Sequence, residues 1–344
     1  MKLRKIIAGI LITLTLTAST FAAKKTDKKD GKLKVVTTIF PQYDWTREIM
    51  GDKASSAQLT LLVGNGVDLH SYQPSIQDIA KISTADIFIY VGGESDGWVK
   101  DALKNATNKS MKVINLMEVL GDKVKAEEIK EGMQAEEEYE DHDHDAEYHD
   151  HEAEGHHHHH DEDEEVEYDE HVWLSLRNAK ILSAEIASVL SEKDPANAAS
   201  YKANYAAYAA KLDALDKDYT AVVASASKKT ILFGDRFPFR YLTDDYGLDY
   251  YAAFVGCSAE TEASFETVVF LSKKVDELGL NSVLKIETGD GKIAQTIIQN
   301  SKKKNAKVLT MDSIQSTTLK QAAAGTTYLK IMEDNLKVLK EALN

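Results

Sequence analysis

The stretch that decides the fold is residues 34–51, KVVTTIFPQYDWTREIMG. Five of its first six residues are β-branched, and this run predicts a short buried strand. Pro41 stands in the first turn of the helix that follows, where its missing amide hydrogen costs nothing, and Gly51 ends that helix. A buried strand followed directly by a helix is the unit from which parallel sheets with helices on both faces are built.

The same rhythm of strand and helix continues on both sides of a central interruption. Before it we predict strands at 59–63, 86–91 and 111–116 and helices at 75–84 and 98–106; after it, strands at 230–233, 249–255, 282–286 and 307–310 and helices at 239–246, 264–278, 292–301 and 326–343. Pro195 begins an alanine-rich helix from 196 to about 223, which would span roughly 45 Å. The predicted fold class is α/β, with two βα lobes of mainly parallel sheets joined by a long rigid helix.

The predicted organisation is a signal peptide at 1–23, an N-terminal lobe at 33–193, a linking helix at 194–225 and a C-terminal lobe at 226–344. Three cations in residues 2–5 precede an apolar stretch at 6–18, and small residues near Ala22 offer a cleavage site. The apolar stretch is short for a stable membrane span, and no cysteine stands near the cleavage site for a lipoprotein anchor. We expect an exported, periplasmic, soluble protein; an uncleaved membrane anchor is the alternative.

The acidity of the chain is concentrated in one segment. Residues 136–170 hold 19 carboxylates and no Lys or Arg, so the other 309 residues carry +4 of a total charge of −15. Nine of the 11 histidines lie there: His142, His144, His149, His151 and His156 through His160. From about Glu127 to Glu170 apolar residues are too few to offset the entropy of ordering, and we expect a mobile loop. Phosphate binding needs a basic face, and we expect no nucleic-acid partner.

Only His70 and His171 remain as imidazoles for the folded body. His70 lies in GVDLHSYQP (66–74), the loop after the second predicted strand, and His171 lies in DEHVWL (169–174), where the acidic segment turns apolar. Ligands of α/β proteins collect at the carboxyl ends of strands. The two histidines therefore favour one shared site, although isolated surface histidines are the alternative.

Catalytic motifs are not evident in the sequence. A zinc hydrolase needs three protein ligands, an open position for water and a general base, and two body histidines cannot supply a His-Glu-x-x-His motif. Cys257, in Gly256-Cys257-Ser258, has no motif around it and, as the only cysteine, cannot form an internal disulfide. We expect no enzymatic activity and no organic cofactor.

The histidine motifs, together with Tyr246-Gly247-Leu248 after the long helix and the next strand, carry a resemblance to a known family. From Lys34 to its C-terminus the chain resembles the zinc/manganese solute-binding proteins of bacterial ABC importers, including the zinc-uptake type with an acidic His-rich loop. The resemblance implies a periplasmic binding protein, expected to be a monomer, that delivers a metal ion to an ABC permease and its ATPase at the inner membrane. It also implies His70 and His171 as metal ligands of the first lobe.

The resemblance implies two further ligands from the second lobe. Counting back from Tyr241 puts Arg236 at the third ligand position, and a one-residue slip beside Pro238 brings Asp235 there instead. Asp312, in KVLTMDSI (307–314), matches the fourth position. Three other carboxylates at or after strand ends are held in reserve for the third ligand: Glu260, Glu262 and Glu287.

Two imidazoles and two carboxylates suit zinc, but also manganese or ferrous iron. The histidines of the loop favour zinc as the transported metal, and its carboxylates raise the local cation concentration. We expect the loop to bind several metal ions weakly, and less so as pH falls, beside one tight site. The alternatives are a manganese or iron importer component, an exported metal buffer or adhesin, and a loop that serves only as an acidic spacer.

Overall fold

Two four-stranded parallel sheets form the framework of the computed structural model, which describes residues 31–134, 166–258 and 262–344. The first sheet has the strand order β2-β1-β3-β4 and the second the order β6-β5-β7-β8. The strands are β1 (Lys34–Thr37), β2 (Gln58–Leu61), β3 (Ile87–Tyr90), β4 (Lys112–Asn115), β5 (Thr230–Phe237), β6 (Asp249–Val255), β7 (Ser282–Ile286) and β8 (Lys307–Met311). Because the two orders correspond strand for strand, β6 occupies in the second sheet the place that β2 has in the first.

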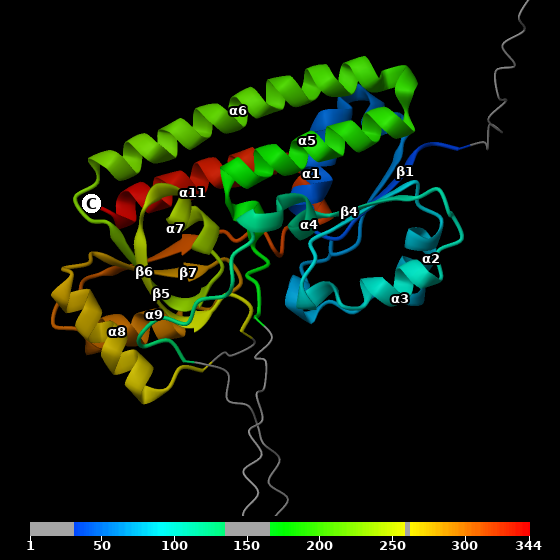
Figure 1. Cartoon of the computed structure of the whole chain (residues 1–344). Helices are drawn as coiled ribbons and strands as arrows, with labels where there is room; N and C mark the ends of the chain where they lie inside the picture. The colour runs from blue at the N-terminus through cyan, green and yellow to red at the C-terminus, as the bar shows by residue number, and fades with distance from the viewer. Residues whose placement is uncertain (1–30, 135–165, 259–261) are drawn as a thin grey trace, which may run out of the picture. The chain divides into compact units, whose positions relative to one another are not determined.

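Helices cover both faces of each sheet (Figure 1). They are α1 (Phe40–Met50), α2 (Ile76–Ser83), α3 (Val99–Lys104), α4 (Leu116–Leu120), α5 (Leu176–Lys193), α6 (Ala198–Ser225), α7 (Arg240–Tyr246), α8 (Phe265–Glu277), α9 (Lys292–Asn300), α10 (Leu319–Ala323) and α11 (Tyr328–Ala342). On one face of the first sheet Ile82 of α2 and Val99 of α3 pack against Phe88. On one face of the second, α8 and α9 bury Leu232. The helices packed on each sheet fix the position of its strands and of the edge at which their carboxyl ends lie.

The long helix α6 packs against helices of both lobes (Figure 1). Near its start Asn204 Nδ2 donates to the carbonyl of Ile49 in α1 (3.0 Å), and near its end the Tyr219 hydroxyl donates to the carbonyl of Met332 in α11 (2.7 Å). Tyr201, Tyr208 and Tyr219 are buried along it. The predicted fold class, two βα lobes with parallel sheets joined by a long helix, is confirmed.

The inner faces of both lobes share one buried apolar cluster rather than meeting as separate cores. Trp173 donates from Nε1 to the carbonyl of Ser313 (2.8 Å), and the Tyr328 hydroxyl donates to the carbonyl of Trp173 (2.7 Å). Residues 32–344 accordingly form one compact unit. In the described part of the chain, no helix combines the length and apolarity needed to cross a membrane.

Both described ends of the acidic segment are bonded to the protein. Glu127 N donates to the Glu167 carbonyl (2.8 Å), and Gln134 N donates to the carbonyl of Ala253 in β6 (2.9 Å). The sequence places a mobile loop at about 127–170, but residues 127–134 and 166–170 lie against the fold because their backbone groups find partners there. The nine clustered histidines and the predicted signal peptide lie outside the described residues.

Candidate metal centre

His70 is held by its own loop at the carboxyl end of β2. Its backbone amide donates to Asp68 Oδ1 (3.1 Å), which caps the short 3-10 turn Leu69–Ser71. On the ring, Nδ1 lies 2.7 Å from Ser95 Oγ, and Glu170 Oε2 lies 3.8 Å from the same nitrogen. A partner on Nδ1 fixes the orientation of the ring and leaves Nε2 available.

His171 is fully buried and its ring is fixed from the opposite side. Asp169 Oδ1 accepts from the His171 backbone amide (2.8 Å) and lies 2.9 Å from Nδ1. Asp169 is itself placed by Tyr241, whose hydroxyl donates to the Asp169 carbonyl (2.8 Å). A carboxylate on the outer ring nitrogen is the usual support of a histidine that binds a metal.

The two imidazoles meet at their inner nitrogens. His70 Nε2 lies 3.2 Å from His171 Nε2. Two nitrogens bound tetrahedrally to zinc at 2.0–2.1 Å would be separated by about 3.3 Å. Burial, together with the nearby charge of His171, lowers the pKa of His70, which keeps that ring in its neutral, metal-binding form. The sequence prediction that both histidines share one site therefore agrees with the geometry.

Cys257 stands beside this pair, although no sequence motif surrounds it. The ligand atoms of His70, His171 and Cys257 all lie within 4.8 Å of one another, and this is the group of metal-binding side chains found in the described residues. Cys257 follows the carboxyl end of β6, and its amide donates to Glu127 Oε1 (3.3 Å). Burial raises the pKa of its thiol. Its place after a strand end was the signal that could have identified it.

The second-lobe loop that carries Gln315 lies against His171 Nε2. When the Gln315 amide nitrogen donates to Asp68 Oδ1 (2.9 Å), the amide oxygen faces His171 Nε2 at 2.7 Å. The preceding residue, Ile314, is fully buried with φ of 64°, in the left-handed region that β-branched residues rarely adopt. Such strained conformations collect at functional sites, and this one immediately precedes the residue that faces His171.

Asp235 does not join the group, because β5 extends to Phe237 and places this residue inside the strand. Its oxygens accept from the amides of Arg236 (2.9 Å) and Ile286 (3.2 Å). Arg236 instead reaches the loops that carry His70 and Cys257: it donates to Asp68 Oδ2 (2.7 Å) and to the carbonyl of Ser258 (3.2 Å). The predicted third ligand thus has a backbone-binding role in this structure.

Asp312 also lies outside the three-residue group. It follows β8, and its Oδ1 accepts from the Ile314 amide (2.8 Å). Burial and repulsion by Glu287 raise the pKa of Asp312 to about 7. Glu287 is occupied by Ser313 and Ser316, Glu262 is exposed, and Glu260 lies outside the described residues.

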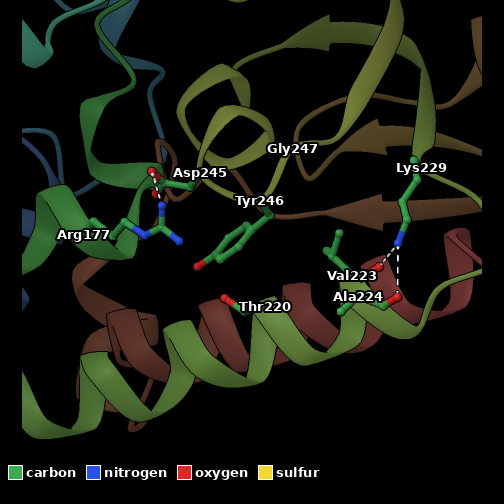
Figure 2. Close-up of a pocket in the computed structure, with 8 residues that line it drawn as sticks. All are labelled: Arg177, Thr220, Val223, Ala224, Lys229, Asp245, Tyr246 and Gly247. Atoms are coloured by element: carbon green, nitrogen blue, oxygen red, sulfur yellow. Dashed lines mark hydrogen bonds and ion pairs between the residues drawn. The ribbon is translucent and has the colours of Figure 1, made fainter.

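A separate pocket lies beside the end of α6 (Figure 2). Its charged groups are paired: Arg177 with Asp245 (3.6 Å), and Lys229 with the carbonyls of Val223 and Ala224. Its lining includes none of the histidine and cysteine ligands described above. The candidate site is therefore the histidine pair and not this pocket.

Comparison with known proteins points to one family. A family model described as the periplasmic component A of the zinc-uptake complex matches residues 35–342. The zinc-binding protein AdcA of Streptococcus pyogenes serotype M18 is 31% identical over 339 residues, which are 96% of this chain and 61% of that protein. The chain thus spans about three fifths of the length of these relatives. The high-affinity zinc uptake system protein ZnuA of Bacillus subtilis is 30% identical, over 98% of this chain and 96% of that protein.

Solved structures give the same picture. The Zn(II)-bound ZnuA-like domain of Streptococcus pneumoniae AdcA superposes with a TM-score of 0.65 at 28% identity, covering 91% of this chain and 99% of that one. The metal-dependent lipoprotein YcdH of Bacillus subtilis superposes with a TM-score of 0.68 at 27% identity, with the same coverage. The fold is therefore shared over 91% of this chain.

Proposed function

Because this chain belongs to the family of periplasmic zinc-uptake components, we propose that it captures a divalent cation, zinc, outside the cytoplasm and delivers it for import. The resemblance inferred from the histidine motifs is thereby confirmed at the level of the family. Members of this family are binding components of an uptake complex, so we assign the chain no enzymatic activity.

The observation that carries the proposal is the 3.2 Å separation of His70 Nε2 and His171 Nε2. At this distance the two Nε2 atoms share a hydrogen bond in the metal-free chain, and a cation bound to both would take the place of the shared proton. The outer ring nitrogens already have Ser95 and Asp169 as partners, so both rings are oriented before metal arrives. Neutral imidazole is a ligand preferred by zinc over magnesium, calcium or manganese.

We propose an ABC permease and its ATPase as the partners that receive the metal, with the chain acting as a monomer in the periplasm. The names of the relatives support this: one is a zinc-binding protein and another a high-affinity zinc uptake system protein. The shared core and α6 limit the movement of one sheet against the other. Release therefore depends on the loops that carry the ligands, including the Asp312–Gln315 loop.

Asp312 is our proposed carboxylate ligand of the metal-loaded state. It belongs to the loop whose Gln315 faces His171 Nε2, so a small movement of this loop would bring a second-lobe oxygen to the metal. This would replace the hydrogen bond from the Ile314 amide. An Asp312→Asn variant should bind zinc more weakly than the unaltered chain if the carboxylate takes part.

Two measurements test the function. Equilibrium dialysis with zinc and manganese in competition should show one tight zinc site, and His70→Ala should abolish it. In cells that lack the protein, the unaltered chain should restore growth when zinc is withheld by a chelator, and His70→Ala should not. Tight binding of manganese in preference to zinc, or growth restored by the histidine variant, would contradict the proposal.

A further inference from the structure

We propose that the thiolate of Cys257 is the third protein ligand, which makes the site a set of two nitrogens and one sulfur that discriminates zinc from manganese. The inference rests on the proposed function and names the class of metal that the site accepts. Its starting observation is that Cys257 Sγ and the ring nitrogens of His70 and His171 lie within 4.8 Å of one another.

The distances suit one shared cation after a small adjustment. With zinc bound to nitrogen at about 2.0–2.1 Å and to sulfur at about 2.3 Å, a tetrahedral site separates sulfur from nitrogen by about 3.6 Å. Because the atoms now lie within 4.8 Å of one another, the sulfur has to move by no more than about an ångström. A cysteine side chain turns about a single bond, and Cys257 lies beyond the end of β6 rather than within it.

The topology gives Cys257 the same position in the second lobe that His70 has in the first. β2 and β6 are the corresponding edge strands of the two sheets. His70 lies in the loop after β2, and Cys257 lies two residues after β6 ends at Val255. Because ligands gather at the carboxyl ends of parallel strands, both loops contribute to the same place.

Gly256 allows the Cys257 loop to lie directly against the histidine. A Cβ at Gly256 would lie 3.0 Å from His171 Cε1 and 3.0 Å from the Phe237 carbonyl. Both contacts are tighter than ordinary van der Waals contact, so a side chain there would require the loop or His171 to shift. The residue before the cysteine is therefore small at the point where the loop approaches His171.

The residues that sequence comparison offered for the third position are otherwise engaged. Asp235 accepts from two backbone amides inside the second sheet. Arg236 is a permanent cation and cannot bind a metal. Its guanidinium joins Asp68, which caps the His70 loop, to the carbonyl of Ser258, the residue after Cys257. Arg236 thus ties together the two loops that carry His70 and Cys257.

A thiolate changes which cation the site prefers. Thiolate and imidazole suit zinc, whereas manganese and magnesium favour carboxylate, carbonyl and water oxygens. The thiolate and the proposed Asp312 carboxylate together would also balance the two positive charges of the metal ion, since both imidazoles are neutral. The site would therefore reject manganese because its sulfur ligand is soft, and not only because of the size of the manganese ion.

Cobalt(II) bound to the purified full chain provides the direct test, since cobalt replaces zinc and reports its ligands by absorption. The sequence holds one cysteine, so a sulfur-to-cobalt charge-transfer band in the near ultraviolet can come only from Cys257. We expect this band at one equivalent of cobalt, and its loss in Cys257→Ser. Cobalt bound without the band overturns the cysteine ligand and leaves the proposed function standing. Failure to bind either cobalt or zinc overturns the function itself.

Competition titrations with zinc and manganese provide the second readout. Cys257→Ser should lower zinc affinity by about 100-fold or more, beyond the 10–100-fold typical of outer partners, and manganese affinity by far less. Asp312→Asn, at the predicted carboxylate ligand, is titrated alongside Cys257→Ser, so that loss of an oxygen ligand can be compared with loss of the sulfur ligand. An unchanged ratio of zinc to manganese affinity in Cys257→Ser would overturn the proposal. Matching apo-state unfolding of the variants and the unaltered chain excludes misfolding as the cause.

Discussion

Arg236, in the middle strand β5, donates through Nη2 to Asp68 Oδ2 at 2.7 Å and so joins the second sheet to the loop that carries His70. The side chains are 15% and 16% exposed, so the pair is largely removed from water. Although burial acts to raise it, the charge of Arg236 lowers the pKa of Asp68. Asp68 therefore stays ionised and keeps its hydrogen bond to the His70 amide.

Replacing Arg236 with glutamine should weaken zinc binding without removing a ligand. The substitution releases Asp68 and the Ser258 carbonyl, so the loops of His70 and Cys257 lose their common anchor. We expect a loss of about 10-fold or more in zinc affinity, as for other outer partners of a metal site. The unfolding free energy of the apo chain should fall by about 1–3 kcal/mol, because a buried carboxylate loses its partner. Urea denaturation and competition titration measure the two effects.

A double-mutant cycle with Asp68→Asn controls for the orphaned charge. In the double variant no unpaired carboxylate is left, so the two losses of stability should not add. Simple additivity would show that Arg236 and Asp68 act independently and that the pair does not hold the loops.

A methyl group at Gly256 should act on the metal site through geometry alone. In Gly256→Ala the new Cβ meets His171 and the Phe237 carbonyl at 3.0 Å, so the Cys257 loop must shift. We expect weaker zinc binding and a loss of about 1–3 kcal/mol of stability. Gly279→Ala is the control: its φ of 61° makes alanine unfavourable, but nothing lies within 4 Å of the new Cβ. Gly279→Ala should lose stability and keep its zinc affinity; equal zinc affinities in both variants would refute the close approach.

Periodicity predicted most of the strands and the longer helices, because the buried strands are short and most of these helices have a clear start or end. The predicted strands at 249–255 and 282–286 agree with β6 and β7 residue for residue. The helix α5 was missed, since Leu176–Lys193 has no Pro or Gly at its start, and Pro195 beyond its end was assigned to the start of the next helix. β5 proved longer than predicted, since Gly234, Asp235 and Arg236 break the β-branched pattern while pairing continues past a bulge.

Residues of the candidate site could be predicted from the sequence when their type is rare in the folded body. They could not be predicted when their position depends on how the strands pack. Because nine of the 11 histidines lie in the acidic segment, only His70 and His171 were candidates in the folded body, and the structure brings these two together. Cys257 has no neighbouring motif, so its approach depends on the pairing of β6 with β5 and on Gly256, which local sequence does not reveal. The same holds for Asp235, whose position inside a strand follows from the length of β5.

The stability of the apo chain should fall as pH rises through the range in which Asp44 ionises. Burial raises the pKa of Asp44 to about 6 from 3.8, against the opposing effect of Arg47. Between about pH 4 and 6 the folded state therefore binds more protons than the unfolded state, so stability declines with rising pH. The full shift corresponds to about 3 kcal/mol above pH 6.

Asp44→Asn removes this ionisation while an amide oxygen can still accept from the Tyr328 amide. Relative to the unaltered chain, the variant should gain stability on going from pH 4.5 to pH 7, as measured by urea denaturation with a chelator present. The exposed Asp101 provides the control, because its hydrogen bond to Lys104 lowers rather than raises its pKa. An equal gain in Asp101→Asn would refute the assignment to Asp44.

Excision of the His-rich segment should remove weak sites and spare the tight one. A deletion of residues 135–165 keeps Gln134, which bonds to Ala253, and Glu167, which bonds to Glu127. Equilibrium dialysis should then show one zinc ion per chain at unchanged affinity, with the additional weakly bound ions lost. Because imidazole must be neutral to bind, the weak ions should also leave the unaltered chain first as pH falls. Loss of the tight site on deletion would contradict its placement at His70 and His171 in the folded part of the chain.

The most direct test of the account compares zinc affinity in three variants of the full chain: His70→Ala, His171→Ala, and one with His156 through His160 all replaced by alanine. Because His70 Nε2 and His171 Nε2 lie 3.2 Å apart, we expect either single change to lower the affinity of the tight zinc site by about 100-fold or more. This is a larger loss than replacing a residue that only hydrogen-bonds to a metal ligand usually gives. The fivefold change should leave the tight affinity as it is. Comparable losses in all three variants, or an unchanged affinity in His70→Ala, would show that the histidine pair is not the site.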